Sequence, residues 1–535
     1  MSKPGTVDLD SILLELGEFG RFQVRTYCLI LVTILFCAVY NSQYIFAASE
    51  VAYRCKVPEC EASPPNFVPA GWDRWTYPDG GGRCDRLLPL GSTCTPDSFH
   101  PNETKRCTAW VYEHHNSIVS EFDLACQEWK RTLVGTMHSA GLFVALPLTA
   151  YISDTFGRRI ALILTAVAPA VVGIARSFSQ NYATYITLEF LDSTVGAGVY
   201  SSGFILALEM VGLNKRVMGG NIISCTFALG QATVALVAWA VPEWRTLTRV
   251  IYAPSFIFLL YYFVIEESVR WLLSRGRSKE AARIIFKVAA VNNKKLSPET
   301  IKKLTAEDLK VDDTKPQDEQ KKASVALQVL KSRVLMSRVC ICSFWWITVT
   351  FIYYGLSINS VSLAGNSYVN YIFTSLIEIP GYFISMVTLN RFGRKSSIMT
   401  AFFICGLSLV SLPFIPYNLQ WLQTSLNMLG KMSISMAFSS IYIYTSELYP
   451  TTLRHSLVAV CSMCGRIGQV VAPQTPLLMA YMESLPYILF GVMAFSSGLL
   501  MLLTPETLDT RLPDTVQQAE DIAVPRTRTT DILVD

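Results

Sequence analysis

The feature that most constrains this chain is a polar signature that occurs twice. The segment Asp154–Arg159 (DTFGRR) returns as Asn390–Lys395 (NRFGRK), 236 positions later (390 − 154). Two further groups recur at nearly the same offset: Glu209 with Arg216 as Glu447 with Arg454, and Glu267-Ser268 as Glu506-Thr507. Three landmarks at one spacing, separated by long apolar runs, indicate an internal repeat.

The composition indicates that the two repeats lie in a membrane. Hydrophobic residues make up 51% of the 535 residues, charged residues only 16%, and the mean hydropathy is +0.34. Apolar stretches of about 20 residues, the length that crosses a bilayer, occur twelve times, six in each half. The expected spans are 24–48, 133–152, 160–176, 182–208, 218–241, 247–265, 338–358, 368–389, 396–416, 422–444, 456–480 and 485–503.

Lysine and arginine in the connections predict the orientation. They gather on one side of the expected spans, which marks that side, with both termini, as cytoplasmic. The first apolar stretch has no small-residue cleavage site after it, so we expect a signal anchor rather than a cleaved signal peptide. The expected regions are a cytoplasmic N-terminus (1–23), a first six-helix bundle (24–265) that includes an extracellular loop (49–130), a cytoplasmic linker (266–335), a second six-helix bundle (336–504) and a cytoplasmic tail (505–535).

The first long connection is rich in cysteine. An even number of cysteines in one exposed loop of an oxidising compartment predicts disulfides, with fifteen pairings open; free thiols are the alternative. The six are Cys55, Cys60, Cys84, Cys94, Cys107 and Cys126. Asn102-Glu103-Thr104 is a glycosylation sequon in the same loop.

The second long connection joins the halves and is rich in lysine and acidic residues. Ser278 and Ser297 resemble helix caps, and Pro298 suits a first helical turn. We expect short amphipathic helices beneath the bundles. A solvated linker and a surface for anionic lipid headgroups are both compatible with this composition.

The sequence offers little for enzyme chemistry. It contains no Walker-type phosphate loop, and His138, the only histidine in an expected span, has no Gly-x-Ser-x-Gly elbow beside it. A membrane receptor or sensor is an alternative class, but a receptor does not require a duplicated signature. Two halves with an interface between them provide a substrate site and a rocking motion, which favours a transporter over an enzyme.

Ionisable residues inside expected spans each cost about 2.5–3.5 kcal/mol on insertion scales, so each requires a reason. They are Glu189, Asp192, Glu378, Lys431 and Arg466. Glu189 and Asp192 lie close to small residues, which favours a role in helix packing. The other three either line a solvated central cavity or form a buried pair, such as Glu378 with Lys431 or Arg466.

Aromatic residues of the seventh span are further candidates for the wall of the same site. Trp346 and Tyr353 stand seven residues apart on one face of the seventh span, together with Trp345 and Tyr354. Aromatic walls suit organic ions through cation–π contacts and flat apolar area. Lipid-facing or packing aromatics are the alternative for each of them.

The combination of motifs resembles a known family. The Asp-x-x-Gly-Arg-Arg pattern is similar to the loop signature of the major facilitator superfamily. More specific segments are Tyr53–Cys55, Ser120–Cys126, Glu267–Leu273 and Tyr444–Thr451. With the large cysteine-bearing loop, they resemble the organic cation, anion and carnitine transporters. The departures from the family pattern are Ala150, Thr155, Glu189, Glu266, Val269 and Asn390.

The resemblance implies an all-α membrane protein with the major facilitator fold and alternating access of one central site. It places Trp346, Tyr353 and Glu378 in the cavity wall. Lys431 matches a position that is basic in many relatives, and Arg466 one that is Asp in cation carriers but Arg in anion and carnitine carriers. No enzymatic activity and no cofactor are implied, and the coupling ion, Na⁺ or H⁺, is left open.

The recurring charges are expected to form a gate. Pairs between helix ends would be intact while the cytoplasmic side is closed and broken as it opens; anchoring at lipid headgroups is the alternative. The residues of this expected network are Asp154, Arg158, Glu209, Glu267, Arg394, Glu447 and Arg454.

Arg466 and Glu378 have opposite implications for the charge of the substrate. A fixed guanidinium suits a carboxylate, so we expect a carnitine-like zwitterion or an organic anion, with a simple organic cation as the alternative. The other expected partners are the lipid bilayer of the plasma membrane and no nucleic acid, and the oligomeric state is left open.

Overall fold

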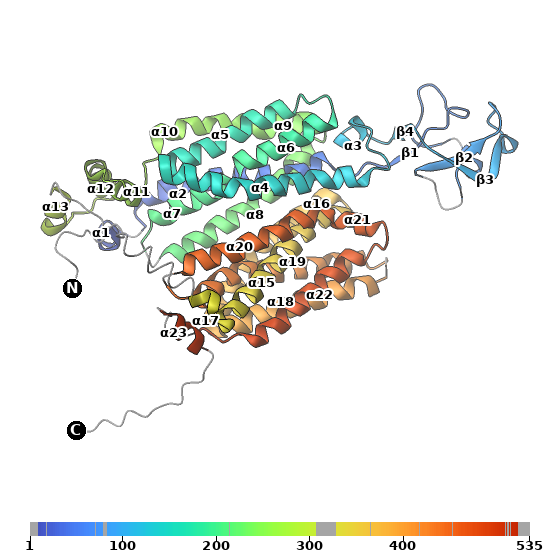
Figure 1. Cartoon of the computed structure of the whole chain (residues 1–535). Helices are drawn as coiled ribbons and strands as arrows, with labels where there is room; N and C mark the ends of the chain where they lie inside the picture. Colours follow the sequence, from blue (N-terminus) through green and yellow to red (C-terminus); the bar gives the residue numbers. More distant parts are fainter. Residues whose placement is uncertain are drawn as a thin grey trace.

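The computed structural model describes residues 9–522 except 18, 70, 79–82, 213, 214, 306–327, 364, 417, 452, 509, 511, 512 and 514. The ends of the chain and the middle of the expected linker therefore lie outside the described residues. Two groups of long helices lie side by side, and a small β-containing segment projects from one end of them (Figure 1).

The first group contains six spans, of which two are built from consecutive shorter helices. These elements are α2 (Arg21–Ala47), α4 (Glu128–Phe156), α5 (Arg158–Arg176), α6 (Tyr182–Gly196) with α7 (Gly198–Glu209), α8 (Arg216–Ala240), and α9 (Trp244–Tyr252) with η4 (Ala253–Leu260) and α10 (Tyr261–Val264).

The second group repeats this arrangement. Its elements are α15 (Arg333–Asn359) with η5 (Ser360–Ser362), α16 (Ser367–Leu376) with α17 (Glu378–Arg391), α18 (Arg394–Ser411) with η6 (Leu412–Phe414), α19 (Gln420–Glu447), α20 (Arg454–Val471) with η7 (Ala472–Gln474) and α21 (Thr475–Met479), and α22 (Leu485–Leu500) with η8 (Met501–Leu503).

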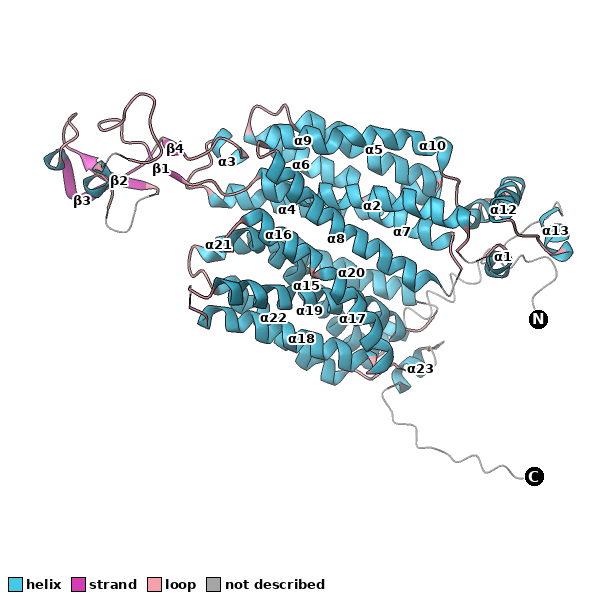
Figure 2. Cartoon of the chain, turned by 180° about the vertical axis from the view of Figure 1, so that it is seen from behind, coloured by secondary structure: helices cyan, strands magenta, loops and turns pink. Residues whose placement is uncertain are grey.

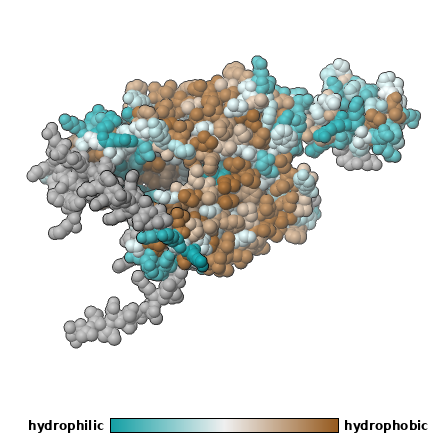
Figure 3. All heavy atoms as spheres, in the orientation of Figure 1, coloured by the Kyte–Doolittle hydropathy of each residue, from teal (hydrophilic) through white to brown (hydrophobic). Residues whose placement is uncertain are grey.

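Eleven of these spans are long and apolar enough to cross a bilayer, counted among the described residues. The remaining one, α19, has 28 residues but carries Asn427, Lys431 and several serines, which lower its hydropathy. The twelve-span prediction therefore agrees with the fold. On the face seen in Figure 3, the side chains of both groups are largely hydrophobic, whereas the two ends are largely hydrophilic, as expected of a protein surrounded by lipid.

The β-containing segment, which we call the cap, comprises the described residues between α2 and α4 (49–127). It holds two antiparallel two-stranded sheets, β1 (Tyr53–Cys55) with β4 (Trp110–Tyr112), and β2 (Asp85–Pro89) with β3 (Phe99–Arg106). Short helices η1 (Trp72–Trp75), η2 (Pro96–Ser98) and α3 (Ile118–Glu121) complete it. The end of the molecule that carries the cap is called the loop face.

The opposite end is called the linker face and carries the remaining short helices (Figure 2). These are α1 (Leu9–Glu15), α11 (Val269–Ser274), α12 (Ser278–Asn292), α13 (Pro298–Thr305) and α23 (Val516–Asp521). Ile12, Trp271 and Ile285 belong to one buried cluster there, so α1 packs against the start of the linker.

The two predicted helix starts in the linker differ in their outcome. Ser297 lies at the start of α13 and its hydroxyl accepts the Thr300 backbone N–H at 3.2 Å. The prediction that Ser278 caps a helix is wrong, because Arg277 occupies the cap position of α12 without a side-chain bond, and Ser278 is already helical.

Candidate functional site

An aromatic surface lies on α15 and α19 where the second half faces the first. The Trp346 ring lies 5.1 Å from that of Tyr442 and 6.1 Å from that of Phe438, centroid to centroid. Tyr353 stacks on Phe438 at 5.5 Å. Trp346 and Tyr353 were both predicted as site residues, whereas Phe438 and Tyr442 of α19 were not.

The first half contributes two polar groups to the same place. The amide of Gln231 in α8 donates to the Tyr353 hydroxyl at 3.0 Å. Tyr200 in α7 lies near Tyr354 and Tyr442. The aromatic surface is therefore part of an interface between the halves, rather than a lipid-facing patch.

Glu378 and Lys431 form a fully buried ion pair in the second half. Their charged atoms are 3.1 Å apart, and neither side chain is exposed. The carboxylate also accepts the Tyr353 and Tyr382 hydroxyls at 2.7 and 3.1 Å. The ammonium donates to Ser357 at 2.7 Å and lies 3.3 Å from the centroid of the Tyr353 ring. Of the two pairings that the sequence allowed for Glu378, the structure has the one with Lys431.

Arg466 on α20 has a different environment. Its guanidinium donates to Gln469 at 2.7 Å, and it acts electrostatically on Tyr354 and Tyr442 of the aromatic surface. Among the described residues no carboxylate lies within 4.0 Å of it. Arg466 is half-buried. It therefore presents a positive charge beside the aromatic rings, and none of the described residues is its ionic partner.

The halves touch each other towards the loop face. Gln474 accepts the Thr132 hydroxyl at 3.1 Å and donates to Thr136 at 2.5 Å, which joins η7 to α4. Tyr368 of α16 stacks on Phe46 at 5.6 Å and on Trp239 at 6.2 Å. A cavity of about 460 Å³ lies just outside this contact, between the base of the cap and both halves.

No ion pair or hydrogen bond between the two halves is recorded at the linker face for the residues that the structure describes. Figure 3 shows the surface hollowed between the two halves on that side. The recorded bonds at the ends of the molecule therefore join the halves at the loop face, and the surface is hollowed between them at the linker face.

The recurring signature of the first half forms one network at the turn between α4 and α5. The Arg158 guanidinium lies 2.8 Å from Asp154 and 3.7 Å from Glu209. Glu267 accepts the backbone N–H groups of Arg158 and Arg159 at 2.8 and 3.1 Å. A carboxylate at the first turn of α5 also suits the positive end of that helix.

The second half repeats this network with different residues. Glu506 accepts the backbone N–H groups of Arg394 and Lys395 at 2.8 and 3.1 Å. The Arg394 guanidinium lies 3.5 Å from Glu447, which also accepts the Thr507 hydroxyl at 2.5 Å. Asn390 replaces Asp154, so the acid within the turn has no counterpart here.

All these recorded pairs lie within one half, and Arg454 donates to the Tyr449 carbonyl at 3.4 Å, also within its own half. The sequence did not reveal whether the partners lie in the same half. These pairs are intact although the surface is hollowed between the halves at the linker face, which runs against the expectation that they break as this face opens. Their effect on transport stays a prediction.

The cap is held by the six predicted cysteines. They pair as Cys55–Cys107, Cys60–Cys94 and Cys84–Cys126. The asparagine of the sequon, Asn102, lies exposed on β3, and its glycosylation stays a prediction.

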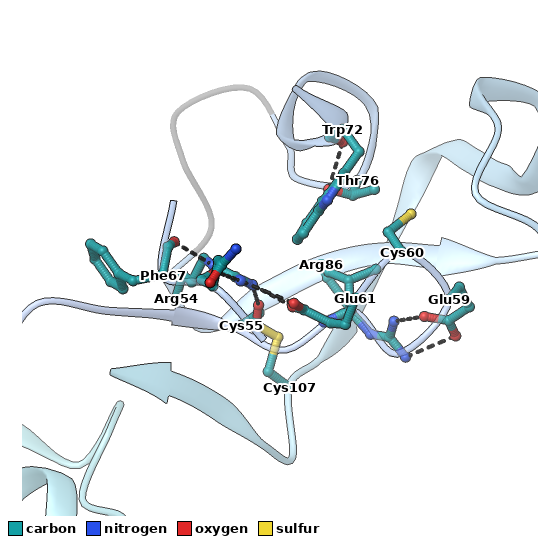
Figure 4. A network of polar contacts seen from close by, with 12 residues as sticks. Arg54, Cys55, Glu59, Cys60, Glu61, Phe67, Trp72, Thr76, Arg86 and Cys107 are labelled. Atoms are coloured by element: carbon teal, nitrogen blue, oxygen red, sulfur yellow. Dashed lines mark hydrogen bonds and ion pairs between the residues drawn. A yellow bond between two sulfur atoms is a disulfide. The ribbon is translucent and has the colours of Figure 1, made fainter. Parts of the chain in front are cut away.

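Two arginines organise the interior of the cap (Figure 4). Arg54 donates to both oxygens of Glu61 at 2.5 and 3.1 Å and to the Phe67 carbonyl at 2.7 Å. Arg86 binds Glu59 at 2.5 Å. Burial alone would raise the pKa of Glu59, but hydrogen bonds and the positive charge of Arg86 outweigh it and lower the pKa below its usual range.

Comparison with known proteins supports a family assignment. A family model described as the Major Facilitator Superfamily matches residues 127–473, more than half of the chain. An organic cation transporter protein of Drosophila melanogaster is 32% identical over 527 residues, which cover 96% of this chain and 94% of that protein. Solute carrier family 22 member 3 of Mus musculus is 31% identical, with 96% of each chain covered.

This chain belongs to the major facilitator superfamily. Within the superfamily its relatives place it in solute carrier family 22, and the predicted class of the protein, a transporter of small organic ions rather than an enzyme, is confirmed. The inward open conformation of the xylose transporter XylE from E. coli matches with a TM-score of 0.59 at 14% identity, covering 91% of this chain and 98% of that one. The predicted fold class is confirmed as well.

Two features of this facilitator were missed by the sequence analysis. Tyr200 and Gln231 carry no motif, and only the pairing of the halves brings them to Tyr353 and Tyr354. Arg176 was read as the end of a span, yet it is fully buried and lies 3.1 Å from Asp192. The sequence did contain a signal for this pairing. Arg176 ends the third span, and two acidic residues, Glu189 and Asp192, lie in the fourth span, which follows it.

Proposed function

We propose that this facilitator moves small organic ions across the plasma membrane by alternating access of the site between its halves. The aromatic surface of Trp346, Tyr353 and Tyr442 supports this, because it faces the first half and carries the charge of Arg466 at its edge. Facing halves with a site between them can open that site to either side in turn.

The linker face is proposed to be cytoplasmic, with both termini on that side. Lysine and arginine are enriched in connections at this face, such as Arg158, Arg159 and Arg394. The three disulfides of the cap suit an oxidising exterior. With the halves joined at the loop face, the structure corresponds to a state that is open towards the cytoplasm.

The observation that carries the substrate proposal is the environment of Arg466. Glu378 is neutralised by Lys431 at 3.1 Å, whereas among the described residues Arg466 has only Gln469 as a hydrogen-bond partner. A planar guanidinium without a carboxylate partner matches the geometry of a substrate carboxylate. The preferred substrates are therefore organic anions or carnitine-like zwitterions, the latter with their cationic end against the aromatic rings.

An organic cation is the second candidate. It is favoured by the similarity to proteins named organic cation transporters. Against it, two unit positive charges 4 Å apart repel by about 4 kcal/mol at an effective dielectric of 20. A cation would therefore have to bind away from Arg466, near the rings of Tyr353 and Phe438.

An uptake assay in expressing cells tests this proposal. Tetraethylammonium, carnitine and an aromatic carboxylate are compared, each with and without Na⁺ and with the membrane potential collapsed. We expect Arg466→Asp to reduce carboxylate uptake at least ten-fold and Arg466→Lys to retain part of it, at equal surface expression. Wild-type protein that transports tetraethylammonium and ignores both carboxylates would show that the cation candidate is correct.

A further inference from the structure

A second cluster of charges is buried inside the first half, away from the aromatic surface. The guanidinium of Arg176 binds the Glu189 carboxylate directly and lies 3.1 Å from Asp192. Nδ1 of His138 lies 2.8 Å from Glu189. The four side chains come from α4, α5 and α6, and none is more than 4% exposed.

Packing alone does not account for the charge of this cluster. Two carboxylates and one guanidinium leave a net charge of −1 when His138 is neutral (+1 − 1 − 1), in a site that is almost completely buried. An uncompensated buried charge is among the most costly features that a folded protein can hold. One bound proton, on the imidazole or on a carboxyl group, makes the cluster neutral.

Two unpartnered atoms mark where that proton can reside. Nε2 of His138 and Oδ1 of Asp192 are both buried and have no hydrogen-bond partner among the residues that the structure describes. Both residues line one small cavity of about 10 Å³, together with Tyr40 and Asn41. A cavity of about this size admits one water molecule, and such a water could hydrogen-bond to both atoms.

We propose that His138 and Asp192 form the proton-binding site of this transporter and that the proton moves with the organic ion. A proton on Asp192 Oδ1 passes to the water, which gives one of its own to His138 Nε2. The carboxyl group becomes a carboxylate and the imidazole an imidazolium, so the total charge of the cluster is unchanged.

Other polar groups around the cluster hold it in place. On α9, the Tyr252 hydroxyl donates to Asp192 at 2.5 Å. On α2, Gln43 accepts from Arg176 at 2.8 Å. The titratable and charged groups that face His138 and Asp192 are Tyr40 and Tyr44 on α2, Arg176 on α5, Tyr185 and Glu189 on α6, and Tyr252 on α9.

The cluster is adjacent to the contact that must open at the loop face. His138 lies two residues after Thr136 on α4, and Thr136 binds Gln474 of the second half. The His138 ring lies 4.9 Å from that of Tyr44, and Tyr44 lines the 460 Å³ cavity beneath the cap. Separation of the halves at the loop face would therefore expose the Tyr44 side of the cluster, so the proton is expected to enter from the loop face.

This inference rests on the proposed function, but its test separates the two. Purified protein is placed in proteoliposomes, with radiolabelled tetraethylammonium, carnitine or an aromatic carboxylate as the probe and the membrane potential clamped at zero. Exchange of labelled for unlabelled probe at equal pH on both sides tests transport itself. Accumulation driven by a pH gradient tests proton coupling.

We expect wild-type protein to accumulate the probe about ten-fold under an inward gradient of one pH unit, the limit for one proton per probe. Asp192→Asn makes the cluster neutral without a proton, so it should retain exchange but lose accumulation. Glu128→Gln, the matched control on α4 outside the cluster, should behave like wild type.

Three results would overturn the inference. Accumulation by wild-type protein could be insensitive to the gradient, it could be driven only by the opposite gradient, or it could be retained in Asp192→Asn. Absence of exchange with every probe would instead reject the proposed function. The proton site is then judged without substrate, by infrared difference spectra between acidic and alkaline buffer. A titrating carboxyl or imidazolium band that Asp192→Asn removes supports the site, and its absence from wild type rejects it.

Discussion

At the scale of single residues, the turn glycines show most directly how the sequence specifies the structure. Gly157 and Gly393 adopt φ of +105° and +97°, a region that other residues rarely occupy. A Cβ at Gly157 would lie 2.2 Å from the Glu267 carboxylate, and one at Gly393 would lie 2.6 Å from that of Glu506. Each glycine therefore permits both the turn and the approach of the acid that caps the next helix.

Replacing Gly157 with alanine should slow transport and lower stability. Gly276→Ala is the matched control, because Gly276 also has a positive φ (+71°) but a Cβ there would meet nothing within 4 Å. The control should lose only the strain of about 1–2 kcal/mol, whereas Gly157→Ala also displaces Glu267. Thermal unfolding in detergent and uptake measure the two effects. Equal behaviour of the two variants would show that the contact with Glu267 is unimportant.

Residue types were easier to predict than residue partners. Glu378, Lys431 and Arg466 could be identified from the sequence, because a charged side chain within an apolar span costs free energy unless it is paired or solvated. Which of them pair depends on helix rotation and tilt, which hydrophobic patterns in a bilayer fix poorly since lipid-facing and buried positions are both apolar. For that reason the role given to Glu189 and Asp192 was incomplete and Arg176 was missed.

At the scale of elements, the turns and the cap carry the repeat and its exceptions. The turns after α4 and α17 use the same acid-on-backbone contacts, from Glu267 and Glu506. They differ in that Arg158 has an additional partner, Asp154, at 2.8 Å. The duplicated motif made this symmetry predictable, whereas the pairing of six cap cysteines could not be derived from spacing.

The Asp154 turn should matter for the rate of transport. Asp154→Ala removes one of the two carboxylates beside Arg158 and should cut uptake several-fold at unchanged surface expression, since the pair is exposed and adds less than about 1 kcal/mol to stability. Asn390→Ala, the equivalent position of the second half, is the control and should have a smaller effect. If the uptake rate of Asp154→Ala equals that of wild type, the expectation that Asp154 belongs to a gate is incorrect.

The disulfide between Cys55 and Cys107 should be required for a folded cap. Its ends are 52 residues apart, and the chain-entropy model assigns a crosslink of that length about 4 kcal/mol. The double change Cys55→Ser with Cys107→Ser should therefore reduce surface expression. Cys340→Ser, which alters a free cysteine, is the control. Undiminished surface expression of the double variant would mean that the other two disulfides suffice.

At the scale of the whole molecule, the two halves behave as separate bodies joined near the loop face. Each half has its own buried core. Among the described residues, the one cluster of the first half that includes a residue of the second, Tyr371, lies towards the loop face. The two-bundle architecture could be predicted from the repeat, but the conformational state could not, because both states of a rocking transporter share one sequence.

Locking the loop face should stop transport. The native side chains of Thr136 and Gln474 are joined by a 2.5 Å hydrogen bond. With Thr136→Cys and Gln474→Cys, a short bis-methanethiosulfonate crosslinker should join α4 to η7 and abolish uptake, and a reductant should restore it. Each single variant is its own control and should keep its uptake when treated with the crosslinker. Full transport by the crosslinked protein would contradict the proposal that this contact opens in every cycle.

The bond between Cys84 and Cys126 has a consequence for how the transporter can be inhibited from outside. Cys126 lies two residues before α4, and Glu121 at the base of the cap binds Trp244 and Arg245 at the start of α9. The cap is thus fastened to the first half and travels with it. An antibody fragment that binds the cap and the α21–α22 turn at the same time would hold the two halves in a fixed arrangement. It would stop the transport cycle without reaching the substrate site.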